Sequence, residues 1–385
     1  MPSAIVTGAT GILGREIVKE LCSRPEEWST IYAMSRSKKE DFGPRAKHVR
    51  LDLTAAAETM SDDLKDVDAD YVFFAAYLQQ DSEEDSTRVN GNIPNTWIKW
   101  LFITGRASTI KRFVLVTGAK NYGVHLGRVK IPMQETDPWY PPFPPNFYYR
   151  QQRILQKFCE KHSIEWNVTY SNEVFGFAKG NFMNFGSAIA IYGAVSKELG
   201  DELVFPGSEE FYTNATVFTD AGLHAQFSRW AALEPRAANE AFNVVNGDVE
   251  SWMNLWPRVA KYFGLKVPAD QFLRDAPLAS ERPLQPEPPA SVLAKEMGLQ
   301  DCVSQSYIRQ RIDLVKWSKT EQVQNAWKKM ADREGLDASA LNKASWAFAG
   351  FAWGRDYNVV LNMTNWENLE SIFDTLQKEK VIPKM

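Results

Sequence analysis

Cysteine is scarce in this chain of 385 residues. The three cysteines are Cys22, Cys159 and Cys302, and they form no CxxC or Cys/His pattern of the kind that binds metal. The four histidines also lack the spacing of metal ligands. We therefore expect no metal site, and we expect a reducing, cytoplasmic compartment in which the thiols pack as small apolar groups.

Long apolar runs and blocks of one charge are also missing. No apolar run reaches the roughly 20 residues of a membrane span, and a strand that begins by Ser3 leaves no room for a signal segment. The formal net charge is -4, without a Lys/Arg block that could neutralise phosphates. These absences predict neither a membrane nor a nucleic-acid partner, while 44% hydrophobic residues suffice for a globular core.

Short apolar runs alternate with helical periods along the first 170 residues or so. This rhythm predicts an α/β fold with a doubly wound parallel sheet of Rossmann type. The runs are residues 4–6, 12–21, 31–34, 49–53, 71–75, 96–102 and 113–116. The segment 149–162 then predicts a helix and 166–170 the next strand.

The pattern changes after Phe177, where longer apolar helices are predicted over 182–199 and 221–232. A chain of this length also favours an accessory lobe beside the main domain. We expect residues 1–177 to form an NADP-binding Rossmann domain that 236–264 rejoins. Residues 178–235 and 265–385 should form a smaller, mainly helical C-terminal lobe that binds substrate.

A glycine-rich turn, TGATGILG, separates the first strand from the first helix. Glycines permit a tight turn and a close approach of backbone N–H groups to a pyrophosphate, which the helix N-terminus then faces. The position at the start of the βαβ series strengthens this interpretation. The residues expected at the pyrophosphate are Thr7, Gly8, Thr10, Gly11, Ile12, Leu13 and Gly14.

The second strand ends in Ser35-Arg36, where an NAD-binding protein carries an acidic residue for the ribose hydroxyls. A carboxylate would repel the 2′-phosphate of NADP, whereas Arg36 would pair with it. The sequence therefore predicts NADPH/NADP+ as the cofactor.

The Tyr-x-x-x-Lys signature of short-chain reductases is absent, since the fourth residues after Tyr148 and Tyr149 are Gln152 and Arg153. Two other strings are present, TGAKNYGVHLG from Thr117 and PPNFYY ending at Tyr149. They resemble the progesterone 5β-reductase/iridoid synthase-like (PRISE) family of atypical extended short-chain dehydrogenases/reductases. The likeness extends through VFGF at 174–177 and NEAFNVVNGD at 239–248, and covers roughly the first 265 residues.

The resemblance implies that Tyr148 donates a hydrogen bond to the substrate oxygen and that Lys120 supports it electrostatically. A neighbouring ammonium favours the phenolate form of a tyrosine, whose pKa is ordinarily near 10. The resemblance also implies NADPH-dependent hydride transfer to a small enone or carbonyl substrate. Further cofactor contacts implied by the likeness are Asp52, Leu53, Ala75, Ala76, Thr117, Gly118 and Val174.

Two segments depart from the family pattern. Arg150-Gln151-Gln152-Arg153 replaces an acidic string after NFYY, and Tyr170-Ser171-Asn172-Glu173 replaces RPG-N, which alters the wall near the nicotinamide. We expect a pocket with few polar groups, suited to an apolar carbonyl or enone. Its expected lining is Tyr77, Tyr122, His125, Phe182, Met183, Phe348, Phe351 and Trp353.

Two further functions stay open at this point. The same Tyr/Lys pair can protonate an alkoxide, so 1,2-reduction of a ketone, aldehyde or imine is an alternative to 1,4-reduction of an enone. A non-redox role, as an NADP-binding isomerase, cyclase or sensor, is a second alternative. The presence of both Lys120 and Tyr148 argues against a pure sensor, while the rewritten 170–173 segment keeps this alternative open. A homodimer is one assembly that the sequence leaves open.

Overall fold

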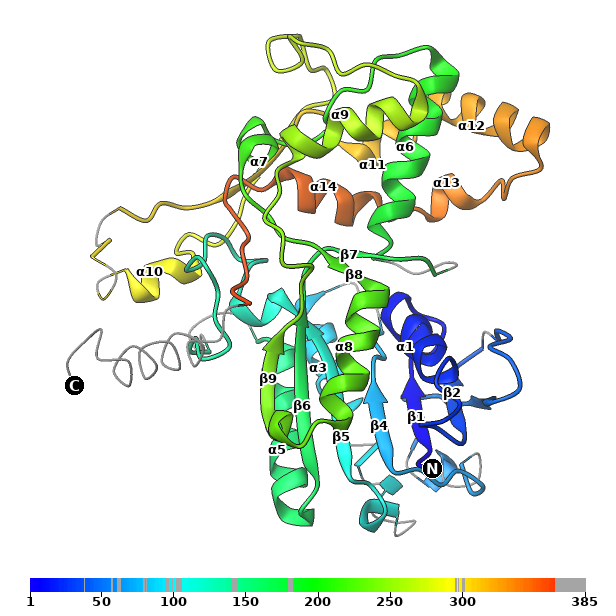
Figure 1. The fold of residues 1–385 in the computed structure, drawn as a ribbon. Coiled ribbons are helices and arrows are strands. Elements are labelled where there is room, and N and C mark those ends of the chain that lie inside the picture. Colours follow the sequence, from blue (N-terminus) through cyan, green and yellow to red (C-terminus); the bar gives the residue numbers. More distant parts are fainter. Residues whose placement is uncertain are drawn as a thin grey trace, which may run out of the picture.

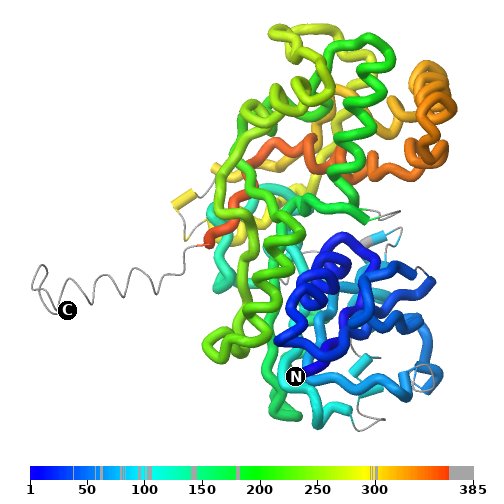
Figure 2. Tube along the Cα trace, turned by 45° about the vertical axis from the view of Figure 1, so that its right-hand side comes forward, coloured from blue at the N-terminus to red at the C-terminus, as the bar shows by residue number. Residues whose placement is uncertain are grey.

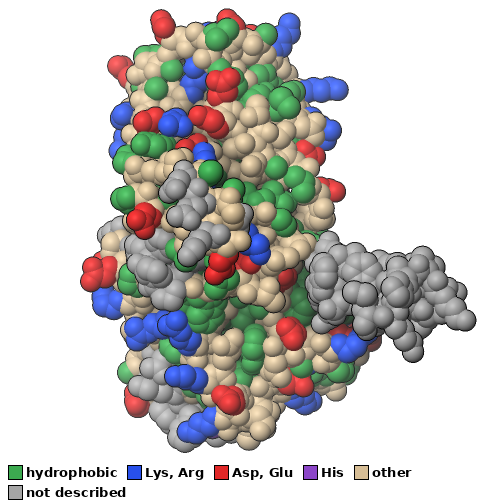
Figure 3. All heavy atoms as spheres, turned by 90° about the vertical axis from the view of Figure 1, so that its left-hand side faces the viewer, with side chains coloured by type: hydrophobic (Ala, Val, Ile, Leu, Met, Phe, Trp, Pro, Cys, Tyr) green, Lys and Arg blue, Asp and Glu red, His purple; other side chains and the backbone are tan. Residues whose placement is uncertain are grey.

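The computed structural model describes residues 1–363, except 38, 57, 61–63, 79, 81, 94–96, 99, 102–105, 140–144, 179–182, 295, 297 and 300–301. Two lobes are stacked one above the other (Figure 1). Figure 2 shows the same two lobes from a second direction, with the N-terminus in the lower lobe. Lys and Arg side chains lie interspersed with Asp and Glu over the face shown in Figure 3.

The lower lobe is built on a seven-stranded sheet of order β3-β2-β1-β4-β5-β6-β9, in which every pairing is parallel. The strand order reverses between β1 and β4, which confirms the predicted doubly wound Rossmann fold. The strands are β1 (Ala4–Thr7), β2 (Ile31–Ser35), β3 (Ala46–Arg50), β4 (Tyr71–Phe74), β5 (Arg112–Gly118), β6 (Glu165–Ser171) and β9 (Glu240–Asn243).

Helices cover both faces of this sheet because its central strands are apolar on both sides. Val6 of β1 packs on one face with α1 (Ile12–Cys22) and α8 (Ala221–Leu233), which lie side by side. Ile5 packs on the other face with α5 (Phe147–His162), beside which lies α3 (Glu83–Asn90). Short 3-10 turns are η1 (Arg106–Ser108), η2 (Ala119–Tyr122) and η3 (Pro235–Ala237).

The upper lobe is mainly helical, as predicted, and its core is aromatic. Trp252, Trp256, Trp353, Phe185 and Phe205 pack together there and are fully buried. Its helices are α6 (Phe185–Leu199), α7 (Glu209–Thr213), α9 (Trp252–Phe263), α11 (Leu314–Trp317), α12 (Glu321–Glu334), α13 (Ala340–Lys343) and α14 (Trp346–Gly354). Helix α10 (Pro289–Leu293) lies instead against the segment after η2, where Ala290 N donates to Arg128 O. Two strand pairs complete the fold: β7 (Val174–Phe175) with β8 (Thr219–Asp220), and β10 (Ser280–Pro283) with β11 (Tyr307–Gln310).

The lobes divide the chain differently from the predicted boundaries of 178–235, 236–264 and 265–385. Helix α8 belongs to the Rossmann lobe, because Ala225 and Ala232 pack against the sheet. Strand β9 rejoins that sheet, but α9 packs in the upper lobe through its tryptophans. After α14 the chain returns to the Rossmann core, where Val359 and Leu361 are buried.

The segment 202–206, which reads as strand-like, is extended but forms no ladder, and Leu203 N donates to Lys266 O instead. Among the helices that the structure describes, none combines the length and apolar composition needed to span a membrane.

Candidate active site

The glycine turn forms a cradle between β1 and α1. Gly8 adopts a positive φ of 67°, and a Cβ atom on it would lie 2.6 Å from the carbonyl oxygen of Ala75. A Cβ on Gly14 would likewise collide with the Gly8 carbonyl. Within the described residues, no side chain caps α1 at Gly11, and the buried Thr7 hydroxyl has no hydrogen-bond partner. The turn therefore offers backbone N–H groups and a helix N-terminus to an anion.

Other predicted cofactor residues gather around this cradle. Ala75 and Ala76 follow β4 at the same edge of the sheet and are half-buried, as Thr10 is within the turn. Val174 packs against the cluster that contains Ile12, beside Leu13. These small and apolar side chains leave room along the cradle for the dinucleotide and fit its binding there.

Ser35 and Arg36 lie at the end of β2, beside the end of β3. Ser35 Oγ lies 3.0 Å from His48 Nε2, and Arg36 is exposed. Arg50 stands opposite Ser35 in the β2–β3 ladder and is also exposed. Arg50 was not among the predicted cofactor residues, although a basic residue at the end of the third strand is a usable signal.

Asp52 lies close to these cations, and Leu53 beside it is buried. Hydrogen bonds from the side chain and the backbone of Thr54 lower the pKa of the Asp52 carboxyl, and the charges of Arg36 and Arg50 lower it further. The edge of the sheet at β2 and β3 thus presents two guanidinium groups and one carboxylate. The guanidinium groups are able to bind a phosphate on the adenosine, and the carboxylate is able to accept a hydrogen bond from the ribose or the adenine.

The two predicted catalytic residues lie in neighbouring elements, one after the carboxyl end of β5 and the other in the first turn of α5. Lys120 belongs to η2, directly after β5, and Tyr148 is the second residue of α5. Asn146 joins the two segments, because its Oδ1 accepts from Tyr148 N (3.0 Å) and its Nδ2 donates to Lys120 O (2.8 Å). Lys120 Nζ stands 5.3 Å from the ring centroid of Phe147.

The Tyr148 hydroxyl lies at the end of β5. A Cβ atom on Gly118 would be 3.7 Å from Tyr148 Oη and 3.0 Å from Ser171 O, so the glycine leaves this space open. Thr117, the preceding residue, is buried and donates to Thr169 O (2.9 Å). Lys120 and Tyr148 therefore lie at the same edge of the sheet as the glycine turn. Gly118, the last residue of β5, is next to the Tyr148 hydroxyl.

Part of the predicted substrate wall lies near this pair. Tyr77 stacks on Phe147 with ring centroids 5.8 Å apart. Burial and, second, the charge of Lys120 hold the pKa of His125 well below its usual range, so a neutral imidazole faces the lysine. Met183 is half-buried, and Phe182 lies outside the described residues.

Two residues of the predicted wall belong instead to the core. Tyr122 is buried and donates to Asn243 Oδ1 (2.7 Å), because its phenol reaches across the end of β6 to β9. Trp353 is fully buried in the upper lobe, 5.3 Å from the ring of Trp256. Both side chains are enclosed by protein, so neither presents a surface to a substrate in this structure.

The other two aromatic residues of that prediction have different neighbours. Phe351 is half-buried beneath the guanidinium groups of Arg282 and Arg355, at 6.0 and 5.9 Å from its ring centroid. Phe348 makes an edge contact with Phe185 at 6.0 Å. These contacts place both residues in the upper lobe.

Sequence reasoning missed a buried ion pair between the lobes. Glu173 follows β6 with a positive φ of 39°, is buried, and pairs with Arg355, which follows α14 and is also buried. Arg355 O accepts from Ser208 Oγ (2.6 Å), and its guanidinium stands over Phe211 at 4.4 Å. The altered 170–173 segment hinted at Glu173, but nothing in the sequence pointed to its partner.

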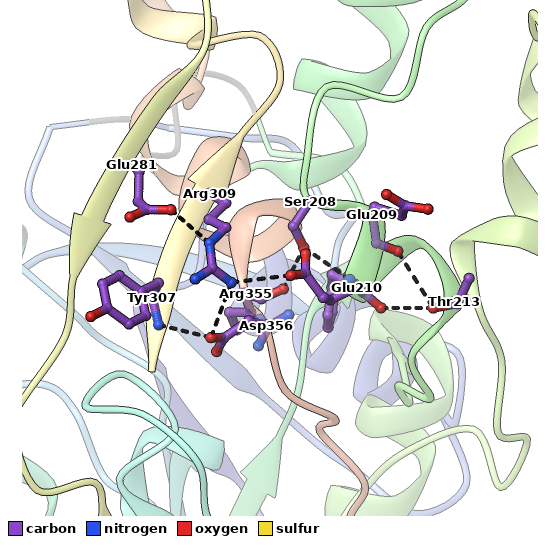
Figure 4. Close-up of polar contacts among 10 residues, drawn as sticks. Ser208, Glu209, Glu210, Thr213, Glu281, Tyr307, Arg309, Arg355 and Asp356 are labelled. Carbon is purple, nitrogen blue, oxygen red and sulfur yellow. Dashed lines mark hydrogen bonds and ion pairs between the residues drawn. The ribbon is translucent and has the colours of Figure 1, made fainter. Parts of the chain in front are cut away.

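Figure 4 shows the polar contacts of Asp356, Arg309 and nearby residues beside Arg355. Its neighbour Asp356 accepts from Tyr307 N (3.1 Å) and lies 3.6 Å from Arg309 Nη1. Arg309 also pairs with Glu210 and Glu281. These contacts anchor the segment that carries Arg355 to β11 and α7.

A separate apolar hollow of about 580 Å³ lies in the upper lobe. Its walls come from α6, α9 and the β7–β8 pair, including Phe175, Phe218 and Tyr262. Neither Lys120 nor Tyr148 lines it, so this hollow is distinct from the candidate active site.

Comparison with known proteins adds the family. The model of the family described as "PRISE-like Rossmann-fold domain" matches residues 47–284, and that of the family described as "Male sterility protein" matches residues 6–72. An uncharacterized protein of Schizosaccharomyces pombe is 36% identical over 99% of this chain and 98% of its own length. A 3-oxo-Delta(4,5)-steroid 5-beta-reductase of Arabidopsis thaliana is 29% identical over 68% and 69%. UDP-glucose 4-epimerase of Thermotoga maritima shares the fold, with a TM-score of 0.54 and 17% identity over 69% of this chain and 85% of that one.

Fold and family together define the class of protein: an NAD(P)-dependent reductase of the extended short-chain dehydrogenase type. Within that class, the chain belongs to the PRISE-like Rossmann-fold family. The resemblance drawn from the TGAKNY and NFYY strings is thereby confirmed.

Proposed function

We propose that this protein is an NADPH-dependent reductase that transfers hydride to the β carbon of a small, apolar enone. The observation that carries the proposal is the joining of Tyr148 and Lys120 by Asn146, at the sheet edge that also holds the glycine turn. The Arabidopsis relative is named for reduction of a 3-oxo-Δ4,5 steroid, which is itself an enone. That name supports the enone as substrate class.

The preference for NADPH is supported by the charges at the ends of β2 and β3. Arg36 and Arg50 are both exposed there, and each lowers the pKa of Asp52 through its charge. A 2′-phosphate placed between two guanidinium groups gains charge-assisted hydrogen bonds that the ribose hydroxyl of NADH cannot form.

The residues of the chain then have separate roles in the reaction. Bound NADPH supplies the hydride. The Tyr148 hydroxyl donates a hydrogen bond to the substrate oxygen, on which negative charge develops as the enolate forms. The Lys120 ammonium favours that donation by stabilising negative charge at the tyrosine. A proton from solvent or from Tyr148 completes the saturated ketone.

The test is the position of the transferred hydrogen. With NADPH deuterated at C4 and a panel of small enones, ketones and imines, we expect a saturated ketone that carries deuterium at its β carbon, detected by NMR of the product. Deuterium at the carbinol carbon would refute 1,4-addition and establish carbonyl reduction. Product without deuterium and without net consumption of NADPH would establish a non-redox reaction.

A further inference from the structure

A row of buried hydrogen bonds runs behind the segment that carries Lys120. Tyr170 Oη, on β6, donates to Gln152 Oε1 on α5 (2.8 Å), and Gln152 Nε2 donates to Asn121 Oδ1 on η2 (2.9 Å). These three side chains are at most 2% exposed. Buried polar groups of this kind are costly to leave unpaired, so each bond constrains its neighbours.

The same helix also holds the backbone of that segment. Tyr149 Oη donates to Asn121 O (2.6 Å), and Asn146 Nδ2 donates to Lys120 O (2.8 Å). The turn η2 has only four residues, and 3-10 turns have poor hydrogen-bond geometry of their own. The direction of Lys120 therefore depends on these contacts from α5.

The row is also neutral. Gln152 and Asn121 are amides, so they constrain the backbone next to Lys120 without setting a second charge beside its ammonium. A carboxylate in the same position would compete with the tyrosine for that ammonium. Neutral amides therefore add no competing charge beside Lys120.

We propose that Gln152 and Asn121 are positioning residues that aim Lys120 at Tyr148, with Tyr170 anchoring the far end of the row. The inference rests on the proposed function, because it presumes that Lys120 supports Tyr148.

Residue Gln151 provides a matched control for Gln152. It is the adjacent glutamine of α5, is 3% exposed, and donates through Nε2 to Asn90 O (2.9 Å), away from η2. Gln151→Met and Gln152→Met therefore remove buried amides of equal size from the same helix. Only Gln152→Met disconnects Asn121.

The measurement is the ionisation of the Tyr148 phenol, which needs neither substrate nor cofactor. The parent protein and each variant are titrated in the ultraviolet, each both with Tyr148 and with Tyr148→Phe. The difference between the two curves is the titration of Tyr148. We expect Gln152→Met to raise the Tyr148 pKa by roughly 0.5 to 1 unit, as the ammonium moves away. Turnover with an accepted enone should fall roughly 10- to 100-fold. Gln151→Met should change neither quantity.

Each other outcome has a definite meaning. If Gln152→Met and Gln151→Met leave the Tyr148 titration alike, the positioning role is overturned. If Gln152→Met does not fold, Tyr170→Phe, which removes only the far bond, should still raise the Tyr148 pKa, and an unchanged pKa overturns the proposal. If Lys120→Met itself leaves that pKa unchanged, the Lys120–Tyr148 pair fails, and with it the proposed function.

Discussion

At the scale of single residues, the start of α5 separates two adjacent tyrosines into different roles. Successive helical residues point about 100° apart. Tyr149 is buried and its hydroxyl donates a hydrogen bond to Asn121 O, whereas Tyr148 is half-buried and lies beside Gly118. The geometry therefore favours Tyr148 as the residue that meets the substrate.

Replacing each tyrosine by phenylalanine should therefore affect a different property, kcat for Tyr148 and stability for Tyr149. Tyr148→Phe should lower kcat by roughly two to three orders of magnitude, as loss of one oxyanion donor does, and leave NADPH affinity nearly intact. Tyr149→Phe should cost about 1 kcal/mol of unfolding free energy and should lower kcat much less than Tyr148→Phe does, because it removes one of several contacts that hold η2. Steady-state kinetics and urea unfolding of both variants measure this. A crippled Tyr149→Phe beside an active Tyr148→Phe would reverse the assignment.

Cofactor choice is also decided by single residues. Arg36→Ala should weaken NADPH binding by roughly 1.5 to 3 kcal/mol, the scale of a charged hydrogen bond, and leave NADH binding almost unchanged. Fluorescence titration with both cofactors gives the two dissociation constants. Lys47→Ala is the control, because Lys47 is exposed on β3 and lies over the Tyr32 ring. Equal losses for NADPH and NADH would contradict the assignment.

At the scale of elements, α8 shows how a helix from the middle of the chain completes the Rossmann lobe. His224 is fully buried on it, with Nε2 3.0 Å from Thr169 Oγ1 of β6 and Nδ1 3.3 Å from Ser228 Oγ. Burial lowers the pKa of His224 to about 4. The imidazole is therefore neutral where α8 packs on the sheet.

This burial predicts a pH dependence of stability. An unfolded histidine takes up a proton near pH 6.5, whereas His224 in the fold resists protonation down to about pH 4. Its contribution is thus complete above pH 6.5 and is lost as the pH falls toward 4, which amounts to roughly 3 kcal/mol. His224→Gln should lose less unfolding free energy between pH 7 and pH 4 than the parent, measured by urea unfolding. Parallel losses would contradict the prediction.

At the scale of the whole molecule, the ion pair of Glu173 and Arg355 joins the two lobes beside the candidate active site. It links the end of β6 to the segment after α14, with both side chains buried. Breaking one partner of a buried pair leaves the other charge without compensation.

Substitution of one partner should therefore destabilise the protein strongly. Glu173→Gln should lower the unfolding free energy by roughly 3 to 5 kcal/mol, and Glu173→Gln combined with Arg355→Met should recover part of that loss. The control is Glu281→Gln, which breaks an exposed pair with Arg309 and should cost less than about 1 kcal/mol. Urea unfolding of these three variants and of Arg355→Met alone measures these differences. A double variant as unstable as the sum of its single changes would show that the pair is not coupled.

The sequence by itself determined the parts of the protein that depend on short spacing. The glycine turn at Gly8 to Gly14 and the parallel strands were readable, because turns and strand periods depend on neighbouring residues. The helix was predicted from residue 149, whereas α5 begins at Phe147, after its cap at Asn146. The family and the NAD(P)-dependent reductase class followed from two short strings and are confirmed. The enone, the preference for NADPH and the roles of Tyr148 and Lys120 stay predictions.

Only the tertiary structure decided which side chains are enclosed and which lobe each helix joins. Tyr122 reads as a substrate contact, yet it bonds Asn243, which is 121 residues away. Trp353 is enclosed by other aromatic residues of the upper lobe, and Glu173 meets Arg355 from the far end of the chain. Burial and ion pairing arise from contacts between segments that are distant in the sequence. The spacing of neighbouring residues does not predict those contacts.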